Sequence, residues 1–169
     1  TKREGEGRTT TETVWVQPPG TPAVGEALLR AYLRTGNTAA LAAARDAAAC
    51  LLQGQYRSGG WNASIEFEPK ERAKHAYRVD PPAPKKRQRN ISSLDDDKTQ
   101  SALRFLMRLD RALKFEDEAL HTATLAGLEA LLAAQFPNGA WAQVWEAPAD
   151  MTQPPDLKAR FPAEWSRTY

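Results

Sequence analysis

The sequence predicts an all-α protein built from repeated helical hairpins. Residues 55–61 and 135–141 share the pattern Gln-x-x-x-Gly-x-Trp and lie 80 positions apart. The apolar positions before each of these turns match at the same shift, with no gap. Such a repeat is one supersecondary unit used more than once. We therefore expect an α/α array, stacked or toroid-like, with repeat units at 23–61 and 103–141.

Each repeat unit is expected to contain two helices. Pro22 suits the first turn of the first helix, and Gly36 with Asn37 breaks that helix. The second helix is rich in alanine, so its contact face must pack closely, and Gly54 lies at its end. The second unit repeats this plan. We predict helices over 23–34, 38–54, 97–113 and 118–134.

Two long excursions follow the tryptophans, over 62–94 and 142–169. Both contain several prolines, and loops of this length inside a compact domain are usually functional or disordered. Ile65 and Phe67 alternate with glutamates, which favours a short strand near 63–67. Because both excursions leave equivalent ends of the hairpins, we expect them on one face, where they would form a groove.

Composition is compatible with one domain, 1–169, that has a real core. The longest apolar stretches are broken by charge, so no segment is expected to span a membrane. The single Cys50 excludes an internal disulfide framework. The net charge is only +2, yet residues 69–91 hold eight Lys or Arg against two acidic residues. This patch favours an anionic partner. A solvated loop is the alternative.

The ends of the chain predict a longer protein. The sequence begins at Thr1 without methionine and stops at Tyr169, just after an apparent loop. Two hairpins are present, whereas about three are needed for closure or stability. We expect an incomplete, N-terminal portion of the array.

The run Asp95, Asp96 and Asp97 has two interpretations. Asp97 is a good N-cap for the helix that follows, with Gln100 three residues on, as in a capping box. Three adjacent carboxylates also repel one another unless a cation neutralises them, and calcium is held by such oxygen clusters. Spacing alone leaves capping and metal binding open.

The two Gln-x-x-x-Gly-x-Trp turns also have two interpretations. The glutamine, glycine and indole close the end of a helix. Trp61 and Trp141 could in addition offer aromatic surface at the floor of a groove. His75 and His121 have no partner at metal-ligand or catalytic spacing, which indicates solvated or hydrogen-bonded histidines.

Together, residues 94–106 and 131–143 resemble the calcium-dependent pectate lyases of the α/α-toroid type. The resemblance extends to 15–22, 55–61 and 162–169, so it covers most of the chain, and the basic loop matches least. It implies cleavage of polygalacturonate, an acidic polysaccharide, by calcium-assisted β-elimination. It also implies a monomer that is secreted or periplasmic and has neither nucleic acid nor membrane as a partner.

The resemblance also suggests site residues. Asp95 aligns with the acidic residue that opens the family's helix-start motif, so Ca²⁺ is expected at Asp95, Asp96 and Asp97, although many members carry Asn or Gly at the last two positions. The base in this family is an arginine, and its motif is not matched here, so we expect it beyond Tyr169. The residues expected to bind substrate are Arg57, Trp61, Lys98, Thr99, Asn138, Trp141 and Arg167.

Two alternatives remain open. Triterpene cyclases also use Gln-x-x-x-Gly-x-Trp turns and an aspartate-rich motif, but a carbocation cyclase needs an aromatic cavity and aromatic residues are only 8% of this chain. A noncatalytic helical-repeat module that binds acidic glycans is the other alternative.

Overall fold

The computed structural model describes residues 2–3, 7–82 and 87–152, and it is mostly helical. The four predicted helices are present, and their observed ends differ from the predicted ones by two residues at most. They are α1 (Thr21–Thr35), α2 (Thr38–Gln53), α4 (Lys98–Ala112) and α5 (Glu118–Ala133). A short helix, α3 (Pro69–Arg72), lies in the first excursion.

The two hairpins close in the same way. The indole Nε1 of Trp61 donates to Leu51 O at 2.8 Å. At the 80-residue shift, Nε1 of Trp141 donates to Leu131 O at the same distance. The side-chain amides of Gln55 and Gln135 donate to the carbonyls of Gly59 and Gly139, both at 2.9 Å. The same side chain thus makes the same bond in both units, which confirms the repeat.

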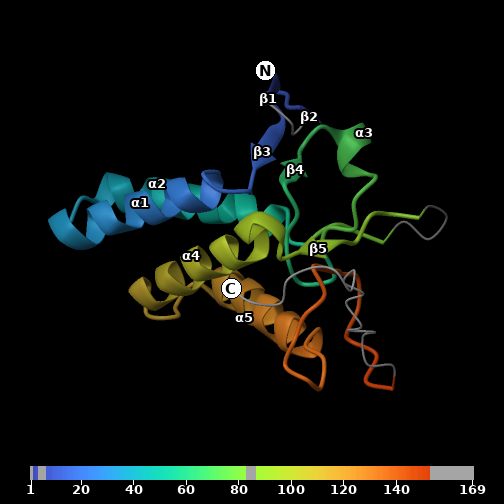
Figure 1. Cartoon of the computed structure of the whole chain (residues 1–169). Helices are drawn as coiled ribbons and strands as arrows, with labels where there is room; N and C mark the ends of the chain where they lie inside the picture. The colour runs from blue at the N-terminus through green and yellow to red at the C-terminus, as the bar shows by residue number, and fades with distance from the viewer. Residues whose placement is uncertain (1, 4–6, 83–86, 153–169) are drawn as a thin grey trace, which may run out of the picture.

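The hairpins pack against each other through the core. Figure 1 shows α1 and α2 side by side, above α4 and α5. Leu29, Leu51 and Leu106 are buried between the layers. Gly25 lets α1 approach α4, because a Cβ there would lie 2.3 Å from the ring of Phe105. The predicted need for small residues at helix contacts is therefore met by a glycine as well as by alanines.

Short antiparallel strand pairs modify the all-α prediction. The predicted strand near 63–67 exists as β4 (Ser64–Glu66), and its partner is β3 (Thr13–Trp15), which the sequence did not reveal. At the N-terminus, β1 (Lys2–Arg3) pairs with β2 (Gly7–Arg8). The chain is thus mostly helical rather than purely helical.

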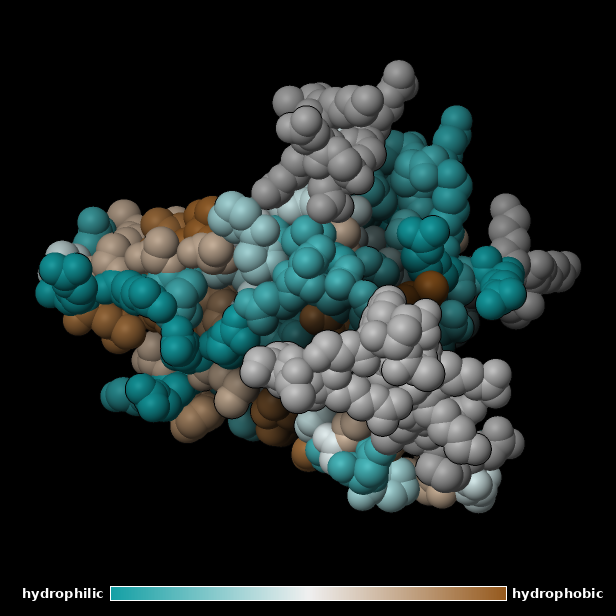
Figure 2. Space-filling view, in the orientation of Figure 1, coloured by the Kyte–Doolittle hydropathy of each residue, from teal (hydrophilic) through white to brown (hydrophobic). Residues whose placement is uncertain are grey.

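The described parts of the two excursions meet through a pair of short strands. In the first, β5 (Ser92–Ser93) pairs with β6 (Val144–Trp145) in the second. The Trp145 indole donates to Ser58 O at 2.8 Å, which ties the second excursion to the turn that closes the first hairpin. On the face shown in Figure 2, hydrophobic residues lie towards the far ends of the helices. Among the described residues, no helix is long and apolar enough to cross a membrane.

Candidate functional site

The acidic run forms a strained turn at the head of α4. Asp95–Asp97 make one 3₁₀ turn, η1, directly before the helix. Asp96 and Asp97 both have left-handed backbones, with φ of 48° and 60°. This conformation costs roughly 1 kcal/mol or more for each non-glycine residue. Two consecutive residues of this kind persist only where other contacts hold the turn.

The capping box predicted at Asp97 is wrong. Asp97 occupies the N-cap position of α4, but its side chain makes no capping hydrogen bond. Its carboxylate instead pairs with Arg104, two turns along the same helix. The Gln100 side chain donates through Nε2 to Leu94 O at 2.8 Å, and its Oε1 accepts no hydrogen bond from the backbone N–H of Asp97. The left-handed backbone of Asp97 accounts for this, because N-cap residues normally have an extended conformation.

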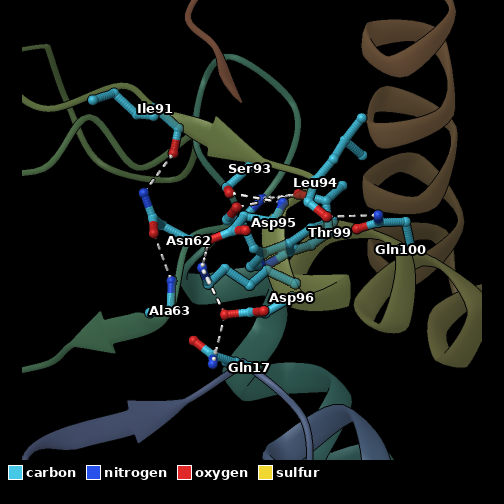
Figure 3. A network of polar contacts seen from close by, with 12 residues as sticks. Gln17, Asn62, Ala63, Ile91, Ser93, Leu94, Asp95, Asp96, Thr99 and Gln100 are labelled. Carbon is cyan, nitrogen blue, oxygen red and sulfur yellow. Dashed lines mark hydrogen bonds and ion pairs between the residues drawn. The ribbon is translucent and has the colours of Figure 1, made fainter. Parts of the chain in front are cut away.

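Asp95 and Asp96 share one positive charge. The ammonium of Lys98 lies 3.0 Å from Asp95 Oδ2 and 3.9 Å from Asp96 Oδ2. The side chain of Lys98 is only 9% exposed, whereas those of Asp95 and Asp96 are 44% and 58% exposed. Gln17, in the segment between β3 and α1, donates a hydrogen bond of 3.0 Å to Asp96 Oδ2, as Figure 3 shows. The buried ammonium of Lys98 therefore offsets the negative charge of two carboxylates that remain exposed to solvent.

The Asp95 carboxyl is held in its charged form. Its pKa is lowered mainly by the hydrogen bond from Lys98, then by a hydrogen bond with Gln143 and by the positive charge of Lys98. The backbone N–H of Asp95 donates to Ser93 Oγ at 3.1 Å, which fixes the start of the turn. Asp95 thus presents ionised carboxylate oxygens at neutral pH.

These carboxylates fit a calcium ion in part. Asp95 and Asp96 are adjacent, exposed and suited to a hard divalent cation, whereas Asp97 is engaged with Arg104. Within residues 2–3, 7–82 and 87–152, no three His, Cys, Asp or Glu side chains come together as a metal site. Calcium takes 6–8 oxygen ligands. Asp95 and Asp96 could supply only some of them, so a ligand or water must supply the rest.

Trp61 and Thr99, both expected to bind substrate, are structural instead. Each is 0% exposed. Thr99 Oγ1 accepts from Trp61 N at 3.0 Å and donates to Trp61 O at 3.1 Å. The predicted aromatic groove floor at Trp61 is therefore wrong. The two hydrogen bonds between Thr99 and Trp61 connect the N-terminus of α4 to the first hairpin and so position the acidic turn.

The other predicted binding residues in the described part of the chain make their hydrogen bonds away from the acidic turn. Arg57 donates to Asp80 O at 2.7 Å in the first excursion. Asn138 accepts from Ala140 N at 3.0 Å and so stabilises the second closing turn. Trp141 is 38% exposed, and Arg167 lies outside the described residues. Of the predicted residues in the described part of the chain, the structure brings Lys98 to Asp95 and Asp96 and joins Thr99 to Trp61.

The hydrogen bond from Gln17 to Asp96 was not predicted from the sequence. Gln17 comes from a segment 79 positions away from Asp96, and no motif marks it except the resemblance of residues 15–22. The surface hollows of the described residues are lined mostly by charged and small side chains. The triterpene-cyclase alternative therefore gains no support from them. Comparisons with protein-family models, with curated proteins and with solved structures found no match.

Proposed function

We propose that this chain belongs to an enzyme that cleaves polygalacturonate by calcium-assisted β-elimination. The observation that supports the proposal is the pair of exposed carboxylates at the head of α4, Asp95 and Asp96. A buried lysine holds them together, and the hydrogen bond and charge of that lysine lower the pKa of Asp95. The resemblance to pectate lyases points to the same residues.

In this proposal Asp95 and Asp96 provide enzyme oxygens to a cation that also contacts a substrate carboxylate. Lys98 limits their mutual repulsion, and Gln17 orients Asp96. Calcium, when bound, would supply Lewis-acid stabilisation of the charge that develops beside the uronate carboxyl group. No arginine of this chain matches the family's catalytic motif, so we assign no catalytic base here.

We also propose that the two hairpins are units of a toroid-like array. On the first unit, the Gln55 side-chain amide donates a second bond, to Ala123 O of α5 at 2.9 Å, and Trp61 is fully buried. On the second unit, the side-chain amide of the equivalent Gln135 donates only to Gly139 O among the described residues, and Trp141 is 38% exposed. The second closing turn thus has the form of a surface on which another hairpin would pack.

The experiment is a lyase assay on polygalacturonate with the longest available form of the protein. We expect unsaturated, ultraviolet-absorbing products that depend on calcium and disappear with a chelator. Saturated products, or activity indifferent to the chelator, would reject the mechanism.

A noncatalytic module for acidic glycans is the second candidate, favoured by the basic residues of the first excursion. Its signature would be binding of polygalacturonate without any product from the complete protein.

A further inference from the structure

A polar hollow lies where the two excursions meet. Its volume is about 500 Å³, and its lining includes Glu71, Lys74, His75, Arg87 and Arg89 from the first excursion and Glu146 from the second. None of these residues belongs to the acidic turn. The hollow is therefore separate from the acidic turn.

The walls of this hollow are held by hydrogen bonds between distant parts of the chain. Arg89 N donates to Lys74 O and Ala76 N donates to Arg89 O, both at 2.8 Å. The amide of Gln88 donates to His75 O at 2.9 Å. The amide of Asn90 donates to Glu146 O at 3.1 Å, which fixes the second excursion to the first. The backbone thus preorganises the hollow.

His75 is a neutral side chain in the wall of the hollow. Its Nδ1 lies 2.6 Å from the hydroxyl of Tyr56, and its ring stacks on Tyr77 with centroids 5.2 Å apart. Burial lowers the pKa of His75 and raises that of Tyr56 well above its usual range, so both are neutral near pH 7. Either atom of the Tyr56–His75 pair can donate the hydrogen bond between them, depending on the tautomer of His75. The pair fixes the position of the imidazole ring beside the arginines.

Positive charge is in excess in the hollow, because Lys74, Arg87 and Arg89 line it together with Glu71 and Glu146. Lys74 pairs with Glu71 at 2.6 Å. Arg87 and Arg89 are exposed, and within the described part of the chain neither guanidinium has an ion-pair partner. Guanidinium groups bind carboxylates through paired, charge-assisted hydrogen bonds. Glu146, on the other side, can accept hydrogen bonds from hydroxyl groups.

We propose that this hollow is a calcium-independent binding site for an acidic sugar. The arginines bind the carboxylate of a uronate, and Glu146 accepts hydrogen bonds from its hydroxyl groups. A plain anion such as phosphate would use the arginines but not Glu146. The proposal rests on the proposed function for the choice of galacturonate, and it adds a contact that the resemblance does not assign.

The test is a calorimetric titration of the chain with trigalacturonate in the presence of a chelator. We expect binding that weakens about tenfold or more in Arg89→Gln, since one charge-assisted pair is lost. The Arg89 backbone makes the structural bonds, so this variant should fold, and circular dichroism checks that it does. Arg34→Gln, an equal charge change on α1 at the other end of the molecule, is the matched control and should bind as the wild type does.

Any of the following results would refute the proposed sugar site. No binding without calcium, or equal losses in Arg89→Gln and Arg34→Gln, would remove it while leaving the calcium-dependent proposal intact. Inorganic phosphate that binds as tightly as trigalacturonate would show a simple anion site and refute the sugar. Glu146→Gln should weaken trigalacturonate but not phosphate, and the reverse result would contradict the role of Glu146.

Discussion

Two glycines offer a controlled test of how the hairpins stack. Gly59 and Gly139 are equivalent in the repeat, and their φ values are 92° and 84°. A Cβ at Gly59 would lie 2.1 Å from Cβ of Ala130 on α5, whereas a Cβ at Gly139 would meet only the Gln135 amide, at 3.9 Å. Alanine at either site adds the same backbone strain, so any difference between the variants reports the contact between hairpins.

The magnitudes follow from these two terms. Left-handed alanine costs roughly 1–2 kcal/mol in both variants. Overpacking against Ala130 adds about 1–3 kcal/mol in Gly59→Ala alone. For a chain of this size 1 kcal/mol lowers Tm by roughly 2–4 °C. We therefore expect Gly59→Ala to melt several degrees below Gly139→Ala.

The assay is thermal and urea unfolding of both variants, followed by circular dichroism and by tryptophan fluorescence. Coincident transitions would justify a two-state free energy. Equal losses of stability in the two variants would refute the packing of α5 on the first closing turn.

Two further predictions concern buried polar groups. Gln55→Ala removes the bonds to Gly59 O and Ala123 O and the bond accepted from Arg78, all at a fully buried side chain, and should cost about 2–4 kcal/mol. Gln135→Ala removes one bond and should cost about 1 kcal/mol or less, and equal values in urea unfolding would contradict this. The pKa of His75 is lower in the folded protein, so between its unfolded value of 6.5 and its folded value the unfolded chain binds more protons. The unfolding free energy should therefore fall as pH drops below about 6.5, and less so in His75→Gln; identical pH profiles would exclude this contribution.

The sequence predicted the helices well because their signals are local. Pro22, Gly36 and the alanine-rich run determine α1 and α2 almost without tertiary help. The strand pair β5–β6 was not predictable, since each strand has two residues and forms only because the excursions meet.

The candidate site was predictable only in part. Identical turn motifs gave no indication that Trp61 would be buried and Trp141 exposed, because that difference depends on which hairpin stacks on which. The Asp95 run was visible as a motif. Its left-handed backbone and the contact from Gln17 arise only in the folded chain.

The central claim is that Asp95 binds calcium together with an acidic polysaccharide. The direct measurement is calcium affinity in the presence of trigalacturonate for wild type, Asp95→Asn and Asp97→Asn. Removing one charge from a calcium ligand should weaken the calcium affinity of Asp95→Asn, whereas Asp97, paired with Arg104, should be replaceable with little effect. Equal affinities in all three proteins, or no calcium binding in any, would contradict the account.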